Sequence, residues 1–217
     1  MKILAATRNA GKQEEIRRVL RGSGVDVVFP DDIWLRESSE GDAVESADTF
    51  EGNARRKAEY FARLSSLPTL ADDSGLEVMA LGGAPGVRSK RWAGASGSPA
   101  EIDAANNAEL LRRLAGAPES KRAARYRCVL VYLTTANSVP IICHGDCTGR
   151  ILEESRGNGG FGYDPLFFSN ELGKTFGEAS AEEKDAVSHR GRALRGFLKS
   201  LRALSGRELG APPAGGA

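Results

Sequence analysis

The chain opens with a pattern that predicts a strand, a helix and a second strand. Residues 2–6 form a short apolar run, and residues 25–29 form another that is rich in β-branched side chains. Between them, Ile16, Val19 and Leu20 recur at the spacing of one helical face, and glycines follow. Such a β-loop-α-β opening is typical of layered α/β folds, so we expect an α/β protein.

Two further helices are indicated in the middle of the chain. Over residues 50–64, alanine and aromatic side chains gather on one side and charged side chains lie elsewhere, which is the pattern of an amphipathic helix. Ser98 and Glu101 form a capping box, with Pro99 at the first helical position. This start signal predicts a helix over residues 99–114.

A short strand and two loops are expected around these helices. Residues 69–71 are apolar enough for a strand, and Gly75 marks a turn soon after it. Residues 31–48 are acidic and without periodicity, and residues 82–86 are rich in glycine. Both stretches are therefore predicted to be irregular.

The second half of the chain predicts a long hairpin and a helical end. Residues 125–135 and 139–152 are rich in β-branched and apolar side chains, and Ala-Asn-Ser lies between them. A hairpin added to the opening unit makes the sheet mixed. A glycine-rich loop at 157–162 follows, and a last helical region extends to about Leu204.

The composition fits one globular domain and excludes several classes of protein. Of 217 residues, 41% are hydrophobic, so residues 1–205 can form one domain, and residues 206–217 are expected to be a disordered tail. With 30 Lys+Arg and 29 Asp+Glu there is no strong field to attract nucleic acid. No apolar run has membrane-spanning length, and the three cysteines suggest reduced thiols. We expect a cytoplasmic protein without nucleic-acid or membrane partners.

A candidate phosphate site lies between the first strand and the first helix. Residues 7–12 read Thr-Arg-Asn-Ala-Gly-Lys, and backbone N–H groups at a helix start favour an anion. The segment is not a P-loop, because it lacks the leading glycine and has Gln13 where serine or threonine would bind magnesium. The alternative interpretation is a polar helix cap with a solvated lysine.

Adjacent carboxylates suggest a metal site. Asp72 and Asp73 follow an apolar strand, a common position for carboxylates that hold magnesium against phosphates. In an extended segment these side chains point to opposite faces, so one of the two is expected to be structural. The alternative is an ordinary turn opened by aspartate. Glu45 lies in an acidic loop of a kind that is more often solvated surface.

Aromatic residues among glycines form a candidate binding loop. Phe161 and Tyr163 lie within the segment Gly-Gly-Phe-Gly-Tyr-Asp-Pro at residues 159–165. An aromatic side chain held on such a loop can stack on a flat ligand. The alternative is a β-bulge whose aromatic side chains pack into the core.

Charged residues near the start of the last helical region could form part of a site. In one continuous helix, Lys184 and Arg190 would be about 240° apart and could not share a site. Ser188 can cap a second helix, so we predict a break between residues 185 and 189 that lets Lys184, His189 and Arg190 converge. The alternative is a basic exposed face.

A zinc site at Cys143, His144 and Cys147 is disfavoured. The spacing invites that interpretation, but the sequence has no second cluster of ligands. Packing of these side chains within the hairpin is the preferred interpretation.

Five segments, taken in order, resemble the inosine/xanthosine triphosphate pyrophosphatase family. Each is weak alone, but together they span residues 2 to about 204. Arg8 departs from the pattern, since many relatives have a small residue there, and the match of Glu45 depends on its spacing before Phe50 and Asn53. The segments are Thr-x-Asn-x-x-Lys at 7–12, Ala-Asp-Asp-Ser-Gly-Leu at 71–76, Gly-Gly-Ala-Pro-Gly-Val at 82–87, Gly-Gly-Phe-Gly-Tyr-Asp-Pro at 159–165 and Glu-Lys-x-x-x-Ser-His-Arg at 183–190.

The resemblance implies a fold, a reaction and an assembly. The expected fold is a long, curved mixed sheet flanked by helices, in two lobes with the active-site cleft between them. The implied activity is Mg2+-dependent hydrolysis of deaminated purine nucleoside triphosphates (ITP, dITP and XTP) to the nucleoside monophosphate and pyrophosphate. A homodimer is also implied.

The resemblance further implies roles for individual residues. Glu45 and Asp73 would hold the metal, and Asp73 would activate the attacking water. Phe161 would stack on the base, and Ser74 would contact the substrate. Residues expected around the triphosphate are Thr7, Asn9, Lys12, Lys57 and Lys184, and those expected around the edge of the base are Asp164, His189 and Arg190. Further expected substrate contacts are Arg8, Ala10, Gly11, Gly162 and Tyr163.

This arrangement would discriminate among purines. A 6-oxo purine presents an acceptor where adenine presents a donor, so Arg190 or a donating His189 would pair with the former and reject the latter. Two other functions remain as alternatives. One is a regulator that binds a nucleotide without turnover, and the other is a nucleic-acid-binding protein, which the near-neutral charge disfavours.

Overall fold

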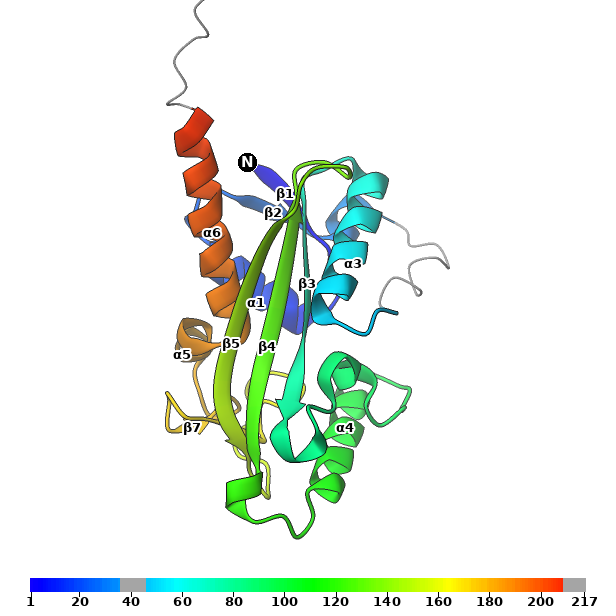
Figure 1. Ribbon diagram of the computed structural model, residues 1–217, viewed down its shortest axis with the longest axis vertical. Coiled ribbons are helices and arrows are strands. Elements are labelled where there is room, and N and C mark those ends of the chain that lie inside the picture. Colours follow the sequence, from blue (N-terminus) through cyan, green and yellow to red (C-terminus); the bar gives the residue numbers. More distant parts are fainter. Residues whose placement is uncertain (36–45, 209–217) are drawn as a thin grey trace, which may run out of the picture.

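A mixed sheet forms the centre of the molecule (Figure 1). The computed structural model describes residues 1–35 and 46–208, and within them seven strands lie in the order β2-β1-β3-β4-β5-β6-β7. β1 is parallel to β2 and β3, and the remaining neighbours are antiparallel. The strands are β1 (Lys2–Ala5), β2 (Asp26–Val28), β3 (Thr69–Val78), β4 (Ala123–Leu133), β5 (Ile141–Ile151), β6 (Phe167–Ser169) and β7 (Lys174–Thr175).

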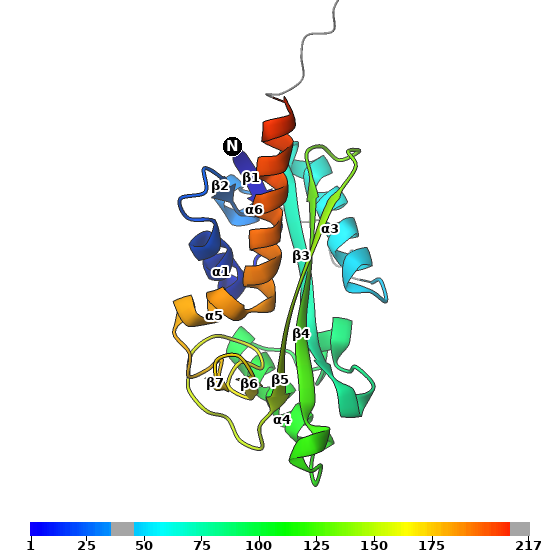
Figure 2. The same ribbon diagram turned by 60° about the vertical axis from the view of Figure 1, so that its left-hand side comes forward.

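Helices cover both faces of this sheet. α1 and α6 lie on one face and α3 lies on the other, while α4 lies at the opposite end of the long strands (Figures 1 and 2). The α-helices are α1 (Ala10–Leu20), α3 (Phe50–Ser65), α4 (Pro99–Arg113), α5 (Ala181–Val187) and α6 (His189–Glu208). Short 3-10 helices are η1 (Pro30–Ile33), η2 (Met79–Leu81), η3 (Gly86–Arg91) and η4 (Glu119–Lys121).

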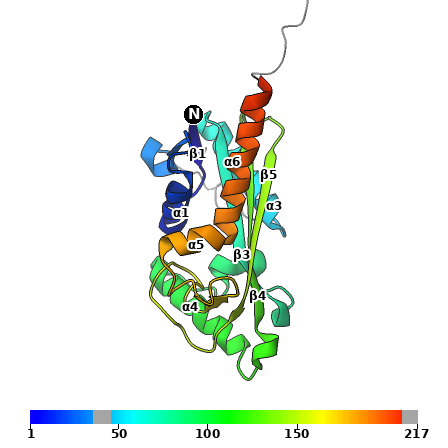
Figure 3. The same cartoon turned by 90° about the vertical axis from the view of Figure 1, so that its left-hand side faces the viewer.

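The long strands β3, β4 and β5 connect two lobes, as Figure 3 shows from the side. One lobe contains β1, β2, α1, α3 and α6, and its core lies on both faces of the sheet. The other is built on α4, β6 and β7, with a core that includes Leu76, Leu110 and Phe167. The expected mixed sheet with flanking helices is confirmed.

The alternation of side chains along β3 sorts its residues between the two faces. Leu70 belongs to the core under α1 and α6, whereas its neighbour Ala71 belongs to the core under α3. Because successive side chains of a strand point to opposite faces, Asp72 faces α1 and α6 and Asp73 faces α3. The expectation that the two carboxylates diverge is confirmed by their different partners.

The predicted turn at Gly75 is wrong. β3 is ten residues long, from Thr69 to Val78, and runs through Gly75, which does not have a positive φ. A Cβ atom there would lie 2.4 Å from the carbonyl oxygen of Gly86 and 3.0 Å from Phe50. Glycine at this position therefore allows close approach of another segment within a strand.

Other boundaries match the sequence patterns with small differences. The capping box at Ser98 and the hairpin of β4 and β5 are confirmed. The short strands β6 and β7 were not predicted, and the loop expected from residue 31 begins with η1. α6 continues to Glu208, so the first three positions of the predicted tail, residues 206–208, are helical. The rest of the predicted tail, residues 209–217, lies outside the described residues.

None of the helices in the described ranges combines the length and apolar character needed to cross a membrane. α6 is the longest of them, with 20 residues, but arginine and lysine recur along it. Its apolar side chains, including Leu194 and Phe197, pack into the core beside the sheet. This helix is therefore built to cover the sheet.

Candidate functional site

The N-terminal segment forms a capped helix start next to the central sheet. Asn9 is the N-cap of α1, and its Oδ1 accepts a hydrogen bond from the N–H of Lys12 at 2.9 Å. The hydroxyl of Thr7 accepts from the N–H of Asn9 at 3.2 Å. The side chain of Lys12 reaches across to Asp72, with Nζ 2.9 Å from Oδ2. The predicted phosphate segment therefore contacts β3 directly.

Asp72 is the meeting point of two cations. Besides Lys12, its Oδ2 accepts hydrogen bonds from Nε and Nη2 of Arg190, at 3.3 and 3.2 Å. Ser74, on the same face of β3, donates to Asp72 and accepts from Arg190 Nη2 at 2.7 Å. Lys12, Asp72 and Arg190 come from three different elements, α1, β3 and α6, so the fold brings them together.

A second carboxylate, Glu15 of α1, continues this ion network. It pairs with Arg190 on one side and with Lys184 on the other, where Nζ lies 2.6 Å from Oε1. Lys184 also contacts Asp164, whose Oδ2 accepts from the N–H of Phe161 at 2.9 Å. Alternating charges thus run from Lys12 to the backbone of the Phe161 loop.

Apart from the partly buried Lys12, the charged side chains of this network are buried, and the pKa values of its carboxylates reflect the neighbouring charges. Burial alone would raise the pKa of Glu15, but Arg190 and Lys184 outweigh it and lower the value to about 2. Burial acts in the same way on Asp72, and Lys12 and Arg190 together hold its pKa far below the usual range. For Asp164, burial dominates and raises the pKa despite the contact with Lys184.

The predicted break in the last helical region is confirmed. α5 ends at Val187, Ser188 accepts from the N–H of Gly191, and α6 begins at His189. The break lets Lys184 and Arg190 converge on Glu15 although they lie six residues apart. The alternative of a basic exposed face is excluded, because both side chains are buried.

His189 packs inside the same region in neutral form. Its ring stacks on Tyr126, with centroids 4.6 Å apart and planes 6° from parallel, and Nδ1 lies 4.0 Å from the sulfur of Cys147. Burial and the positive charge of Arg190 lower the pKa of His189 well below its usual value. A neutral imidazole offers one N–H donor and one acceptor.

Phe161 closes one end of the network. Its ring lies against Gly11, where an added Cβ would be 2.3 Å from Cδ1 of Phe161. Lys184 Nζ lies 4.7 Å from the ring centroid, and Arg190 Cζ lies 5.8 Å from it. Phe161 therefore stands between the two lobes, in contact with the start of α1 and beside both cations.

Asp73 has different neighbours, on the α3 side of the sheet. Its Oδ2 accepts from Nδ2 of Asn53 at 2.9 Å, and its Oδ1 accepts from the N–H of Ser74. Lys57, one turn after Asn53, is buried, and its charge contributes to the lowered pKa of Asp72. The face of α3 that carries residues 53 and 57 therefore approaches both carboxylates.

The carboxylate oxygens of Asp73 are suitable ligands for magnesium. Mg2+ is commonly held by one or two carboxylates together with substrate phosphates, so a protein cage of many ligands is not needed. Cys143 packs in the core under α1 and α6 and Cys147 packs in the core of the α4 lobe, as the preferred interpretation of these side chains expected. The carboxylate of Asp73 fits the magnesium role.

Glu45, the other predicted metal ligand, lies outside the described residues. The chain just after it is placed, since the N–H of Ala47 donates to Oδ1 of Asn53 at 2.8 Å. The same Asn53 donates to Asp73. One amide therefore links the segment that follows Glu45 to Asp73.

Two of the predicted substrate contacts have side chains that point elsewhere. The guanidinium of Arg8 pairs with Asp31 and donates to the carbonyl oxygen of Leu35 at 2.5 Å. Tyr163 is buried in the core of the α4 lobe, and its hydroxyl donates to the carbonyl oxygen of Ser89 at 2.8 Å. Both side chains anchor the loops that carry them.

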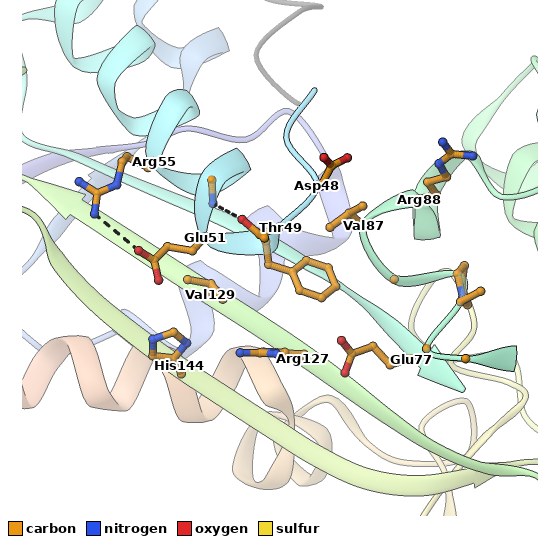
Figure 4. A pocket seen from close by; sticks show the side chains of 17 residues that line it. Asp48, Thr49, Glu51, Arg55, Glu77, Val87, Arg88, Arg127, Val129 and His144 are labelled. Atoms are coloured by element: carbon orange, nitrogen blue, oxygen red, sulfur yellow. Dashed lines mark hydrogen bonds and ion pairs between the residues drawn. The ribbon is translucent and has the colours of Figure 1, made fainter. Parts of the chain in front are cut away.

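A pocket of about 730 Å³ lies on the α3 side of the sheet (Figure 4). Arg127, Val129 and His144 of β4 and β5 form its floor, with Arg88 and Glu51 toward the rim. None of the predicted site residues in the described ranges lines it. Those from Lys12 to Phe161 are instead connected to one another by ion pairs and hydrogen bonds on the other face of the sheet.

Sequence reasoning missed Glu15 and Asn53. Both are polar residues on the otherwise apolar faces of their helices. Glu15 lies beside Ile16 and one turn after Lys12, and Asn53 lies beside Ala54. A buried polar side chain needs a partner, so a carboxylate or amide within an apolar stripe is the signal that could have identified them.

Comparison with known proteins shows to which family the chain belongs. The family model described as the Ham1 family matches residues 3–200. The chain belongs to the Ham1 family. A Ham1 protein from Coxiella burnetii has a similar structure, with a TM-score of 0.80 and 36% identity over 94% of this chain and 99% of that one.

Other Ham1 relatives carry enzyme names. The dITP/XTP pyrophosphatase of Salmonella typhimurium is 46% identical over 202 residues, covering 93% of this chain and 98% of the relative. That of Lactobacillus acidophilus is 45% identical over 94% and 98%. A crystal structure titled nucleoside-triphosphatase / dITP/XTP pyrophosphatase from Mycobacterium abscessus matches with a TM-score of 0.69 and 41% identity, over 91% of this chain and 99% of that one. These Ham1 relatives match nearly full length.

Proposed function

We propose that this Ham1 protein hydrolyses deaminated purine nucleoside triphosphates (ITP, dITP and XTP) to the nucleoside monophosphate and pyrophosphate. The observation that carries the proposal is the buried chain of alternating charges from Lys12 to Asp164, which ends at Phe161. One end of this network offers cations that can bind phosphates, and the other end offers the aromatic ring of Phe161, which can stack on a base. The names of the bacterial relatives support the same reaction.

In this reaction, water attacks the α-phosphorus. A new P–O bond forms there, the bond to the oxygen that bridges the α- and β-phosphorus breaks, and pyrophosphate leaves with that oxygen. Asp73 takes the proton of the attacking water. Asn53 donates a hydrogen bond to the carboxylate of Asp73 and thereby orients that carboxylate. Lys12, Lys57 and Lys184 offset the charge of the triphosphate.

The reaction is proposed to need Mg2+. Asp73, with Glu45 from the neighbouring segment, would hold the ion against the phosphate oxygens. When bound, it supplies charge neutralisation and lowers the pKa of a coordinated water. Asn53 supports this role, because it joins Asp73 to the chain two residues after Glu45.

Base recognition is assigned to the other end of the network. Phe161 stacks on the purine, and Arg190 or the N–H of neutral His189 donates to the 6-oxo group. An adenine amino group would meet the same donors without an acceptor, so ATP is expected to be a poor substrate. Asp164 acts by holding the backbone of Phe161.

A homodimer in the cytoplasm is proposed as the form in the cell. The three cysteines of the chain are free, which fits a reducing compartment. The mass in solution, measured by light scattering, checks the assembly: about 46 kDa is expected from a 23.1 kDa chain.

A product assay tests the proposed reaction. Purified protein with excess Mg2+ is offered ITP, dITP, XTP, GTP and ATP, and nucleotides and phosphate species are separated by ion-exchange chromatography. Pyrophosphate and the monophosphate are expected from the deaminated purines, with little product from ATP. Orthophosphate as the first product would contradict the assigned bond cleavage, and tight binding without any product would favour a nucleotide-binding regulator.

A further inference from the structure

Two side chains of α4 hold the peptide groups of Gly162, the residue after Phe161. Asp103 accepts a hydrogen bond from the N–H of Gly162, with Oδ2 2.7 Å from the nitrogen. Asn107, one helical turn later, donates from Nδ2 to the carbonyl oxygen of Gly162 at 2.9 Å. The two residues therefore fix both polar groups of this one glycine.

Two further groups of the loop are held as well. The N–H of Phe161 donates to Asp164, and the hydroxyl of Tyr163 donates to the carbonyl oxygen of Ser89. Gly162 has a φ of 63°, a left-handed conformation that glycine adopts without strain. The ring of Phe161 points toward the opposite lobe, where it lies against Gly11.

α4 is a firm support for this contact. Its start is capped by Ser98 and Glu101, and Leu110 packs fully buried in the core of its lobe. Asn106, adjacent to Asn107, holds a different segment: it donates to the carbonyl oxygen of Lys90 at 3.0 Å and accepts from the N–H of Ala93 at 2.8 Å. Neighbouring positions of one helix therefore serve separate loops.

We propose that Asp103 and Asn107 are positioning residues for Phe161, fixing the direction in which its ring meets the purine base. This inference rests on the proposed function, in which Phe161 stacks on the base. Stacking requires the ring plane to be parallel to the base, and a small rotation of the Gly162 peptide would tilt it. Neither α4 residue needs to touch the substrate.

A double-mutant cycle tests the coupling. Asn107→Ala and Asp103→Ala are each expected to raise KM for ITP about tenfold, with a smaller change in kcat, because base stacking is a binding contact. In a Phe161→Ala background the same substitutions should have little further effect. Additive losses in that background would overturn the proposal. Asp103→Asn, which keeps an acceptor for Gly162, should restore KM.

Matched controls separate positioning from folding. Asn106→Ala removes hydrogen bonds of the same kind from the same helix but leaves Gly162 held, so KM for ITP should be nearly unchanged. Asn107→Asp keeps the shape and removes the donor, and it serves if the alanine variant does not fold. We call the contacts of Asp103 and Asn107 with Gly162 the clamp. An equal rise of KM in the Asn106→Ala control would contradict a specific role of the clamp.

Amide exchange gives a readout that does not need activity. The N–H of Gly162 should exchange with solvent faster in Asp103→Ala than in the unsubstituted protein, and at an unchanged rate in Asn106→Ala. Unchanged exchange in Asp103→Ala would refute the clamp even if ITP is hydrolysed. Absence of ITP hydrolysis in the unsubstituted protein, with faster exchange in Asp103→Ala, would instead refute the proposed function and with it the role assigned to Phe161.

Discussion

Lys12, which is partly buried, and the buried Asp72 form an ion pair, with Nζ 2.9 Å from Oδ2, that joins the start of α1 to the central strand β3. Asp72 also forms an ion pair with Arg190, so its one carboxylate compensates the charges of two cations. Its neighbour Asp73 faces the other side of the sheet and contacts Asn53. Two adjacent aspartates therefore have separable roles, and substitutions can distinguish them.

Asp72→Asn should destabilise the protein by about 3 kcal/mol, because it leaves Lys12 and Arg190 buried with less compensation. Urea unfolding followed by circular dichroism measures this change. Glu51→Gln, at an exposed ion pair with Arg55, is the control and should cost less than about 1 kcal/mol. A loss of similar size in both variants would contradict the structural role of Asp72.

Asp73→Asn should abolish turnover while the protein stays folded. Asparagine can still accept from Asn53, but it cannot take a proton from water, so kcat is expected to fall at least about a hundredfold. Pyrophosphate release from ITP at saturating Mg2+ measures the effect. Retention of most activity would exclude Asp73 as the base.

Gly11→Ala should weaken binding of ITP by displacing Phe161. The new methyl group would lie 2.3 Å from Cδ1 of the Phe161 ring, so the ring must move. Alanine is favoured over glycine within a helix by up to about 1 kcal/mol, so the melting temperature need not fall. KM for ITP is expected to rise about tenfold. An unchanged KM would show that the ring moves without consequence for binding.

Glu15 makes stability sensitive to acid. Its folded pKa is about 2, below the ordinary 4.5, so the unfolded chain binds the proton more readily. The stabilisation is complete above pH 4.5 and is lost as pH falls toward 2. Free energies of unfolding at pH 6, 4 and 3 should therefore decrease steeply, and the decrease should be shallower in Glu15→Gln. If the free energy of unfolding fell equally with pH in both proteins, Glu15 would not be the source of the acid sensitivity.

Removal of divalent cations should stop the reaction. An excess of a chelator is expected to abolish pyrophosphate release, and added Mg2+ should restore it, because the triphosphate charge must be neutralised next to Asp73. Circular dichroism should show the same fold before and after chelation, since the network is held by direct ion pairs between side chains. Full activity in chelator would exclude a metal-dependent mechanism.

Most of the secondary structure could be predicted, because its signals are local. The capping box at Ser98 and the break at Ser188 depend on side chains that satisfy nearby N–H groups, and both are confirmed. Gly75 was misjudged because its cause is not local: it admits the backbone of Gly86 from another segment. β6 and β7, of three and two residues, are too short to show a period.

The sequence named several residues that the structure brings together, but not the contacts that join them. The resemblance selected Lys12, Lys184 and Arg190, yet nothing in their spacing indicates that Glu15 joins two of them. Its role depends on how α1 lies against α5 and α6, which is a tertiary property. The clamp of Asp103 and Asn107 on Gly162 was hidden for the same reason, since it spans more than fifty residues.

The alternating charges between Lys12 and Asp164 also limit how base preference can change. Each ion in that row compensates its neighbours, so replacing one of the buried ions alone leaves an uncompensated charge in the interior. A variant with a new preference would therefore need compensating substitutions of opposite sign at neighbouring positions. Libraries designed to retarget this enzyme should vary Glu15, Lys184 and Arg190 together.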